Sequence, residues 1–507
     1  MQYRAGDHPI QPPDPVPLAS TTQRILRWLE RTPHAPAFIE PGATYRYGDL
    51  GVGIVQWARV LASSGVGPGT LVGIRHDQRY LHFLLIQACR LVGATSVSLS
   101  GADIAANDPI LGRCQLLCVP DTGVPPQTDG KLGVLVLTQA VIDQVAHTPL
   151  TRDDLRMLDR CPADTAIVRL VKTSGTTGRA KVLAMTQAAM NRLLSKTLRF
   201  PDDPGHAWNV LNLYDFTLRS ALMETEIALR FGQTAVTTSM PTLLADMRRF
   251  STFRLTMVSG DAIRLAAALP PDWVGPRAGV LSVKGGALPE VTRTLLRERA
   301  VTHIYANYAT NETHRIATIG DDGVGTLEPD MRVRILGEDG AEVPPGRIGE
   351  IEVTPTLVDA YAWDEEASAL AFHDGWYRTR DIGMVPAPGR LMVLGRADEM
   401  VTIGGVKVAP GAMETRLRGL PGIRDAVLLS VPTPHGIEDL VVVLECDMDR
   451  LPSPLAQAMI GILAGVVERF HPVLLPALPR TETGKIRRSA LRSALSVQTG
   501  AAQTGLA

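Results

Sequence analysis

Apolar and polar residues along the first two thirds of the chain repeat with two different periods. Thr22–Arg31 and Tyr80–Val92 carry apolar residues at helical spacing, which predicts amphipathic helices. Val134–Thr138 and Ala166–Val171 are short apolar runs rich in branched residues, which predicts buried strands. Because strands alternate with helices, we expect an α/β fold built of two α/β layers.

From about Arg332 the pattern changes to short strands separated by tight turns. Met331–Leu336 and Gly349–Thr354 read as strands, with Pro344-Pro345-Gly346 as a turn between them. This pattern of short strands and tight turns predicts a β-rich subdomain. After Gly395, strands and helices mix over a length that suits a small α+β domain. Its expected strands are Met400–Ile403, Ala426–Val431 and Leu440–Glu445, and its expected helices are Gly411–Arg418 and Leu455–Phe470.

We therefore predict a large N-terminal domain, 1–395, and a small mobile C-terminal domain, 396–507. The tail from Val497 to Ala507 is rich in Gln, Thr, Gly and Ala, and we expect it to be disordered.

Composition narrows the class of protein. Of the 507 residues, 45% are hydrophobic and the net charge is −1, so a large core is expected and no global attraction to nucleic acid. No apolar run reaches the length of a membrane span, and the N-terminus lacks the pattern of a signal peptide. The five cysteines form no CxxC pair, which predicts buried, unpaired thiols in a reducing cytoplasm.

The clearest chemical motif follows the strand Ala166–Val171. Residues 173–181 combine four hydroxyl side chains, two glycines and one of the chain's seven lysines, Lys181. Glycines let backbone amides approach phosphate oxygens, and the lysine adds a point charge. Only two residues separate the glycines, so the loop does not fit the Walker A pattern. A polar surface turn is the alternative interpretation.

The segment resembles the phosphate loop of the adenylate-forming, or AMP-binding, superfamily, with the pattern T-S-G-T-T-G-x-P-K-G. Acyl- and aryl-CoA synthetases, adenylation domains and luciferases belong to this superfamily. Ala180 and Val182 depart from the pattern. The resemblance implies that Thr173 and Lys181 take part in catalysis. It implies nucleotide binding by Ser174, Gly175, Thr176, Thr177 and Gly178.

Two further segments resemble motifs of that family in the expected order. Lys284–Pro289 resembles its GGA segment, which implies nucleotide contacts from Gly285, Gly286 and Ala287. Tyr308–Glu312 resembles Y-G-x-T-E, with Ala309 and Asn311 replacing the usual residues. An aromatic ring can stack on a purine, and a carboxylate can hold Mg²⁺ between phosphates. The resemblance thus assigns Tyr308 and Asn311 to the nucleotide and Glu312 to magnesium and catalysis.

The remaining motifs lie in the C-terminal part of the chain. Trp376–Gly383 resembles W-x-R-T-G-D-x-G, in which Asp381 would bind both ribose hydroxyls and Arg380 replaces a glycine. Gly395–Glu399 resembles the hinge between the family's domains, which implies a ribose or phosphate contact for Arg396 and a hinge at Asp398. The next two motifs contribute a loop with Gly404 and Gly405, expected to serve coenzyme A, and a catalytic lysine, Lys485.

Together the motifs imply ATP-dependent activation of a carboxylic acid to an acyl-adenylate, followed by thioester formation. The implied cofactors are ATP, Mg²⁺ and either coenzyme A or the phosphopantetheinyl arm of a separate carrier protein. We expect the acyl pocket to involve Tyr214, Asp215, Gly286 and Thr310. Two alternatives remain open at this point: an adenylation enzyme that loads an amino or aryl acid on a carrier, and a nucleotide-binding regulator with degraded catalysis.

Overall fold

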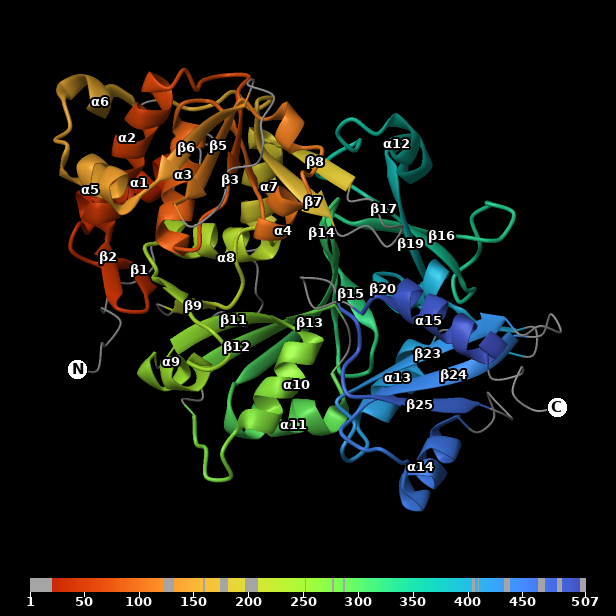
Figure 1. The fold of residues 1–507 in the computed structure, drawn as a ribbon. Helices are drawn as coiled ribbons and strands as arrows, with labels where there is room; N and C mark the ends of the chain where they lie inside the picture. Colours follow the sequence, from red (N-terminus) through yellow and green to blue (C-terminus); the bar gives the residue numbers. More distant parts are fainter. Residues whose placement is uncertain are drawn as a thin grey trace. The chain divides into compact units, whose positions relative to one another are not determined.

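The computed structural model describes residues 21–121, 132–157, 160–173, 181–196, 208–250, 252–275, 278–285, 288–403, 406–408, 410–432, 438–463, 470–480 and 486–501. Its contacts divide the chain into two compact units (Figure 1). The first unit is 1–256 with 357–370, and the second is 257–356 with 371–507. The division falls within strand β11 (Thr252–Val258) and at the end of helix α12 (Glu365–Ala371).

The first unit contains a six-stranded sheet in the order β6-β5-β3-β4-β7-β8. Neighbouring strands run parallel except β7 and β8, which form an antiparallel pair. The strands of this sheet are β3 (Leu71–Ile74), β4 (Thr95–Ser98), β5 (Leu116–Pro120), β6 (Gly133–Leu137), β7 (Ile167–Thr173) and β8 (Lys181–Thr186).

A second group of strands in this unit has the order β2-β1-β10-β9-β11, and all neighbours except β1 and β2 are parallel. Its strands are β1 (Pro36–Glu40), β2 (Ala43–Arg46), β9 (Asn209–Asn212), β10 (Ala235–Thr237) and β11. The unit's other helices are α1 (Thr21–Arg31), α2 (Tyr47–Ser63), α3 (Arg79–Leu91), α4 (Gly101–Ala105), a 3₁₀ turn (Leu111–Arg113), α5 (Gln139–His147), α6 (Arg152–Arg156), α7 (Gln187–Lys196), α8 (Arg219–Arg230) and α9 (Leu243–Arg249).

The main core of the first unit lies between helices α1, α2 and α3 and the strands they cover. Its largest buried side chains include the rings of Phe38, Phe83 and Phe216, each at most 2% exposed. Burying one such side chain stabilises the fold by about 1.5–3 kcal/mol. This core fixes the loop that follows β9, because Phe216 belongs to that loop.

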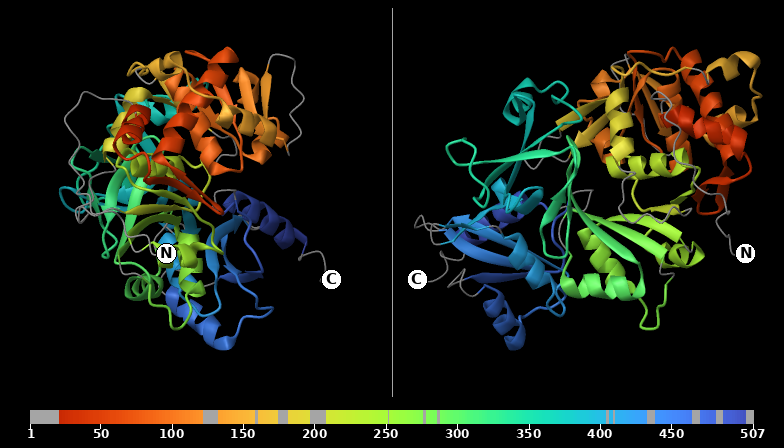
Figure 2. Two further views of the ribbon diagram at one scale, coloured as in Figure 1. Left: turned by 90° about the vertical axis from the view of Figure 1, so that its left-hand side faces the viewer. Right: turned by 180° about the vertical axis from the view of Figure 1, so that it is seen from behind.

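In the second unit, β12 (Ala278–Lys284) and β13 (His303–Thr310) are parallel, and α10 (Ser259–Ala268) and α11 (Glu290–Arg299) pack against them (Figure 2, right). The sheet continues in the order β13-β14-β15-β20-β19-β17-β16 with antiparallel pairs, and β18 pairs with β19. These strands are β14 (His314–Ile319), β15 (Gly325–Leu327), β16 (Arg332–Leu336), β17 (Gly349–Thr354), β18 (Phe372–His373), β19 (Trp376–Met384) and β20 (Arg390–Arg396).

The last hundred or so residues of the second unit have apolar clusters of their own on the two faces of a three-stranded sheet. One cluster lies beneath α13 (Gly411–Arg418) and α14 (Ser453–Leu463), and the other lies beneath α15 (Arg488–Ala501). The strands are β23 (Asp425–Pro432), β24 (Glu438–Glu445) and β25 (His471–Leu475), and a separate hairpin joins β21 (Val401–Ile403) to β22 (Val406–Val408). The domain boundary at 395/396 stays a prediction.

The mixed α/β class predicted from the sequence is confirmed, with most expected strands and helices in place. Two expectations are wrong. Helix α15 continues to Ala501, so the expected disordered tail is helical over its first residues. The helix is anchored before the tail by Leu491 and Leu495, which pack into the apolar cluster beneath it. All five cysteines are unpaired as expected, but Cys161 is exposed rather than buried, since it lies in a loop before β7.

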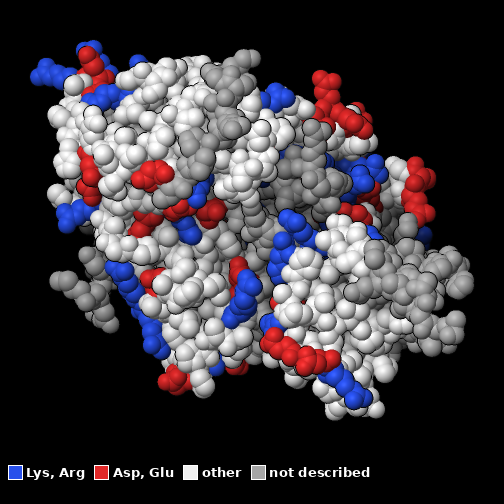
Figure 3. All heavy atoms as spheres, viewed as in Figure 1, with Lys and Arg blue, Asp and Glu red and all other residues white. Residues whose placement is uncertain are grey.

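Two further findings concern membrane-spanning helices and surface charge. No helix in the described part of the chain combines the length and apolarity needed to cross a bilayer. On the face drawn in Figure 3, acidic and basic side chains of the described residues are interspersed.

Candidate functional site

The strands β7 and β8 bring together the two ends of the predicted phosphate loop. Thr173, the last residue of β7, lies opposite Lys181, the first residue of β8, and the Thr173 hydroxyl donates to the Lys181 carbonyl at 3.4 Å. The intervening residues, 174–180, lie outside the described part of the chain. The first unit therefore presents a hairpin whose connection carries the glycines and hydroxyls of the motif.

The two lysines beside this loop have different surroundings. The Lys181 ammonium lies 4.5 Å from the centre of the Tyr361 ring, a cation–π arrangement. Lys172 instead forms ion pairs with Asp103 and Asp108. Burial lowers the pKa of Lys172, but the two carboxylates outweigh burial and raise it. Lys172 thus anchors β7 to α4, whereas Lys181 lies over an aromatic ring, and its role in catalysis stays a prediction.

In the second unit, three residues predicted to hold the nucleotide meet. Asp381 on β19 pairs in register with Arg396 on β20, and the guanidinium lies 3.4 Å from its carboxylate. The hydroxyl of Tyr308, at the end of β13, donates to the same carboxylate at 2.5 Å. Arg396 also donates to the Thr379 carbonyl at 3.0 Å. These contacts orient a buried carboxylate with a positive and an aromatic neighbour.

The electrostatics of this cluster favour a protonated tyrosine next to the carboxylate. Burial, and then the Asp381 carboxylate, raise the pKa of Tyr308 well above its ordinary value, so the hydroxyl keeps its proton and donates. Burial also raises the pKa of Asp381, and hydrogen bonds from Tyr308 and the charge of Arg396 oppose that shift. Asp381 is 8% exposed, so little water competes for its oxygens.

Arg380 occupies the position where the family pattern has glycine. Its φ of 61° is in the left-handed region that glycine adopts most easily. Its side chain is exposed, while Thr379 and Asp381 on either side are buried. The backbone at this position therefore has a conformation that suits glycine, the residue of the family pattern, and Asp381 beside it is buried.

The motif Tyr308–Glu312 ends in a three-residue turn between β13 and β14. The Thr310 hydroxyl accepts a hydrogen bond from the Thr313 amide at 3.2 Å and closes the turn. Asn311 and Glu312 lie within the turn, and Glu312 is only 6% exposed. The described residues contain no group of three or more His, Cys, Asp or Glu that could form a protein-only metal site. A single carboxylate such as Glu312, completed by substrate phosphates and water, is nevertheless an ordinary way to hold Mg²⁺.

Of the remaining predicted residues, the structure describes Gly285 and Asp398. Gly285 directly follows β12 and has a φ of 78°, which requires glycine or strain. Asp398 lies in the 3₁₀ turn Ala397–Glu399, and its carboxylate is 3.4 Å from Arg396. The residues Gly286, Ala287, Gly404, Gly405 and Lys485 lie outside the described part, so their predicted roles stay predictions.

The loop after β9 carries the two residues expected to wall the acyl pocket. The carboxylate of Asp215 accepts hydrogen bonds from the amide and the hydroxyl of Thr217, which caps the turn into α8. Arg79 donates to the carbonyls of Asn212 and Leu213 and holds the start of this loop. Asp215 is exposed and Tyr214 is partly buried.

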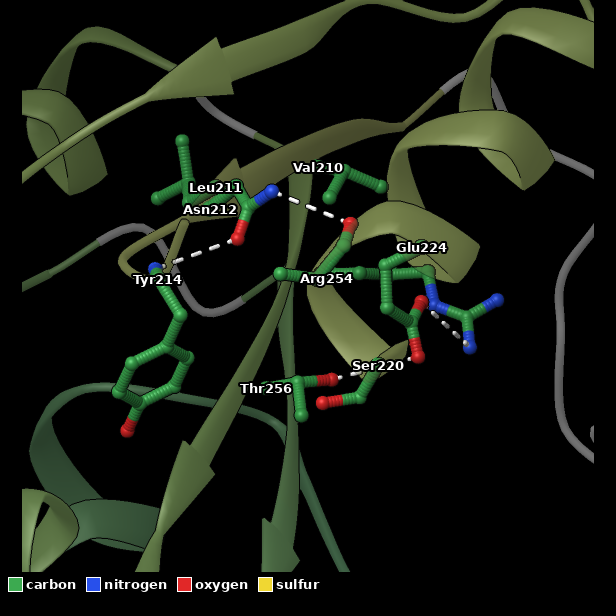
Figure 4. Close-up of a pocket in the computed structure, with 9 residues that line it drawn as sticks. Val210, Leu211, Asn212, Tyr214, Ser220, Glu224, Arg254 and Thr256 are labelled. Atoms are coloured by element: carbon green, nitrogen blue, oxygen red, sulfur yellow. Dashed lines mark hydrogen bonds and ion pairs between the residues drawn. The ribbon is translucent and has the colours of Figure 1, made fainter. Parts of the chain in front are cut away.

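A small hollow with a volume of about 10 Å³ opens beside this loop (Figure 4). Tyr214 lines it together with two charged side chains that no motif indicated, Glu224 and Arg254. The sequence does carry a signal: two glutamates interrupt the apolar run Ala221–Leu229, and an arginine interrupts Phe253–Leu255. The full lining is Val210, Leu211, Asn212, Tyr214, Ser220, Ala221, Glu224, Arg254 and Thr256.

Comparison with known proteins gives these motifs a context. The family model described as AMP-binding enzyme matches residues 25–358. Feruloyl-CoA synthase of Amycolatopsis is 26% identical, over 92% of this chain and 97% of its own length. Indoleacetate–CoA ligase of Aromatoleum aromaticum is 27% identical, over 66% of this chain and 68% of its own. A nonribosomal peptide synthetase of Salinispora arenicola, CymA, is 26% identical, but 94% of this chain spans only 6% of that protein.

Solved structures share the fold over nearly the whole chain. An anthranilate CoA ligase in complex with anthranoyl-AMP superposes with a TM-score of 0.83 at 19% identity, covering 96% of this chain and 99% of that one. MatB of Rhodopseudomonas palustris with bound ATP gives a TM-score of 0.79 at 19% identity, covering 94% and 99%.

Proposed function

Because this chain belongs to the AMP-binding enzyme family, we propose that it joins an aryl carboxylic acid to coenzyme A through an acyl-adenylate. The reaction class, AMP-forming activation of an acid followed by thioester formation, is that of its CoA-ligase relatives. The observation that carries the proposal is the cluster of Tyr308, Asp381 and Arg396, because the buried carboxylate would accept ribose hydroxyls and the tyrosine ring would stack on the base.

In the first step, a carboxylate oxygen of the acid attacks the α-phosphorus of ATP and pyrophosphate leaves. The Asp381 carboxylate would accept both ribose hydroxyls, and Tyr308 and Arg396 hold that carboxylate in place. The loop that begins at Thr173 and ends at Lys181 would bind the leaving pyrophosphate through amides, hydroxyls and the lysine charge. Catalysis is then mainly positioning and stabilisation of phosphate charge.

The remaining residues have roles that we infer from their positions in the motifs. Mg²⁺, held by Glu312 and the phosphates, would neutralise phosphate charge. Lys485 would stabilise the same charge from the C-terminal domain. In the second step, the thiol sulfur of coenzyme A attacks the acyl carbon, its proton is lost to solvent, and AMP leaves. The loop with Gly404 and Gly405 would admit the thiol arm.

An aryl acid is supported by two kinds of observation. The named relatives and neighbours include enzymes for ferulate, indoleacetate and anthranilate. In addition, the expected acyl wall at Tyr214 is aromatic. A carrier protein as thiol donor is the second candidate, favoured by the match to the peptide synthetase of Salinispora arenicola. An amino-acid enzyme would need the Asp215 carboxylate for the substrate ammonium. In this structure the exposed Asp215 instead accepts from Thr217 and caps its own loop.

The test is an assay of the purified protein with ATP, Mg²⁺ and a panel of benzoic, cinnamic, arylacetic, fatty and amino acids. We expect pyrophosphate release with aryl acids, and acyl-CoA by mass spectrometry once coenzyme A is added. Pyrophosphate release without consumption of coenzyme A, together with loading of a phosphopantetheinyl carrier, would favour the second candidate. No release with any acid, while ATP still binds, would make the chain a nucleotide-binding protein rather than an enzyme.

A further inference from the structure

A buried arginine on β7 has only neutral hydrogen-bond partners among the described residues. Arg169 is 3% exposed, and its guanidinium donates to the hydroxyls of Ser96 and Ser98 on β4, at 3.3 and 2.5 Å. It also donates to the backbone carbonyl of Phe216 at 3.0 Å. Its Nε meets no acceptor in the part of the chain that the structure describes. Burying a charge without a carboxylate partner costs free energy, so stability alone does not account for an arginine here.

The carboxylate that influences Arg169 most is already paired with another arginine. Glu226 contacts Arg90 at 2.9 Å, and both side chains are at most 1% exposed. Burial lowers the pKa of Arg169 to about 10, the charge of Glu226 opposes that shift, and the charge of Arg90 adds to it. Near pH 7 Arg169 is therefore still charged and keeps all its donors.

The contacts of Arg169 hold Phe216 by its ring as well as by its carbonyl. The Ser98 hydroxyl accepts from Arg169 and has its own proton left for His82, whose Nε2 lies 2.7 Å away. Burial, and then the charge of Arg169, lower the pKa of His82 to about 3, so its ring is neutral. The His82 ring meets the fully buried Phe216 ring edge-on, with the two centres 5.5 Å apart.

A second arginine holds the other end of the same loop. We call residues 213–218, between β9 and α8, the acyl loop. Arg79 on α3 donates to the carbonyls of Asn212 and Leu213 at 2.6 and 2.9 Å. Tyr214 and Asp215, the residues expected to face the acid, thus lie between two points where an arginine from another element holds the backbone. The position of the acyl loop depends on those two side chains.

Arg169 also stands close to the predicted phosphate loop. It precedes Thr173, the last residue of β7, by four positions, and the phosphate loop begins there. β7 is parallel to β4, and β9 is parallel to β10 in a different sheet. Ligands of parallel sheets bind beyond the carboxyl ends of the strands, where the phosphate loop and the acyl loop both begin. The hydrogen bond from Arg169 to Phe216 is therefore a direct link between the two segments.

We propose that Arg169 is a positioning residue for adenylation: by holding the acyl loop against β7, it fixes the place of the bound acid relative to the phosphates of ATP. The inference rests on the proposed function, because it takes the acyl loop to wall the acid. It goes beyond that function in naming a residue outside the motifs that aligns the two reactants.

The two half-reactions need this alignment to different degrees. In adenylation the acid and ATP are separate molecules, and a misplacement of about 1 Å can cost about 100-fold in rate. In the thioester step the acyl group and the phosphate are already joined by a covalent bond in acyl-AMP. Loss of the Arg169 contact should consequently slow the first step and spare the second, whereas a general folding defect would lower both.

The test is the variant Arg169→Met, assayed in each half-reaction separately. The acid is whichever of benzoic, cinnamic and phenylacetic acid the wild-type protein activates fastest. The single-turnover rate of acyl-AMP formation should fall at least about 10-fold, while the ATP concentration for half-maximal rate stays within about twofold. Conversion of purified acyl-AMP by coenzyme A should stay within about twofold of the wild-type rate, because its bond replaces the alignment.

Two further variants control for burial and for folding. Arg230 on α8 is another buried arginine of the first unit, and burial lowers its pKa to about 10 as well. Arg230→Met should leave both half-reactions unchanged. Arg169→Lys keeps the charge but replaces the fork of donors with one ammonium, so it should slow adenylation alone, by at least about threefold. Thermal unfolding identifies the folded variants, and Arg169→Lys decides if Arg169→Met does not fold.

The acyl loop itself is followed by hydrogen–deuterium exchange without substrates. The amides of Thr217 and Leu218 donate to Asp215 within the loop, so their exchange reports whether the loop keeps its shape. In Arg169→Met they should exchange at least about 10-fold faster than in the wild type, because the opening of a segment becomes easier when its anchor is lost. In Arg230→Met they should exchange at the wild-type rate.

The outcomes separate the inference from the function beneath it. If a folded Arg169 variant lost both half-reactions equally, or neither, the inference would be overturned and the proposed function would stand. If the wild-type protein activated no acid, the proposed function would be overturned. Exchange would then decide the inference: equal rates in Arg169→Met and the wild type would overturn the anchoring too, and faster exchange confined to the Arg169 variants would support it.

Discussion

Arg380 adopts a backbone conformation that few residues other than glycine adopt without cost. Its φ of 61° places the backbone in the left-handed region, which costs an L-residue about 1–2 kcal/mol. Thr379 and Asp381 on either side are buried while Arg380 is exposed, which is the alternation of a strand, so Asp381 faces inward with Thr379. At this scale, Arg380 replaces the glycine of the motif at a position whose φ suits glycine, and the adjacent Asp381 is buried.

We therefore expect Arg380→Gly to be neutral or stabilising by up to about 1 kcal/mol, since the strain removed slightly exceeds the extra chain entropy of glycine. Adenylation should be unchanged. Arg380→Val should destabilise the fold by more than 1 kcal/mol, because a branched side chain tolerates this region poorly. Urea unfolding of both variants measures the difference. A harmless valine would show that the left-handed conformation is not present in solution.

Glu312 is the residue for which magnesium should matter most. Glu312→Gln should raise the Mg²⁺ concentration needed for half-maximal activity and lower adenylation by about 10²-fold, roughly 2.7 kcal/mol of transition-state stabilisation. Pyrophosphate release is followed against Mg²⁺ concentration. Glu338→Gln, an exposed glutamate of the same unit, serves as control. Equal Mg²⁺ dependence in the two variants would remove Glu312 from the metal site.

At the scale of elements, the segment that leads to Lys485 is anchored by a network of charges. The carboxylate of Asp425, at the start of β23, contacts Arg418 on α13 at 2.5 Å and Arg480 at 2.7 Å. Arg480 also contacts Glu445, at the end of β24, at 2.8 Å. Burial would raise the pKa of Asp425, but the two arginines outweigh burial and lower it. The network thus ties one helix, two strands and the start of the lysine loop together.

This network predicts a pH-dependent stability. A carboxylate whose pKa is lowered by folding stabilises the protein above its unfolded pKa of about 3.9, and that contribution is lost as the pH falls through the folded pKa. Asp425→Asn should therefore cost about 3 kcal/mol at pH 7, the usual scale for breaking a buried pair. The difference from wild type should shrink below about pH 4. Urea unfolding between pH 7 and pH 3 measures it.

The matched control for that experiment is Asp447→Asn. Asp447 pairs with Arg424, but its side chain is 84% exposed, so solvent screens the interaction and stability should be nearly unchanged at every pH. If Asp425→Asn behaved in the same way, the arginines would not be holding the buried carboxylate in solution.

At the scale of the whole molecule, the proposed reaction needs two different segments of the C-terminal part to face the same acyl-adenylate in turn. Lys485 and Gly405 belong to the same C-terminal part of the chain, and Asp398 is the predicted hinge before it. A rotation at the hinge would present Lys485 for adenylation and the Gly404-Gly405 loop for thioester formation. Two ion pairs lie at this predicted hinge. Asp398 pairs with Arg396, and the next residue, Glu399, pairs with Arg488 at 3.6 Å.

The two half-reactions should consequently be separable. Lys485→Ala should slow acyl-AMP formation by about 10²–10³-fold, the effect of losing one preorganised charge-stabilising group, while supplied acyl-AMP is still converted to thioester. Gly405→Leu should do the reverse, because a side chain would obstruct the approach that glycine permits. Both variants are assayed in both half-reactions with purified acyl-AMP. Equal loss in both steps by folded variants would rule out the rotation.

The motifs could be recognised in the sequence because each consists of residue types with few alternative uses. Glycines, hydroxyls and a rare lysine at residues 173–181 indicate phosphate, and the alternating helices and strands around them indicate an α/β fold. These are local properties: periodicity decides which face of an element is buried, and glycine decides where the backbone can turn. The lack of an apolar run of membrane-spanning length is likewise a local property, read from the sequence without reference to any contact.

Only the tertiary structure decided which charged side chains share a site. Lys172 and Lys181 look alike in the sequence, yet one is held by Asp103 and Asp108 and the other lies over Tyr361. Glu224 and Arg254 are 30 positions apart and belong to no motif, and they meet because α8 covers the parallel strands β9 and β11. Burial and pairing are properties of contacts between distant elements, so no local pattern of residues contains them.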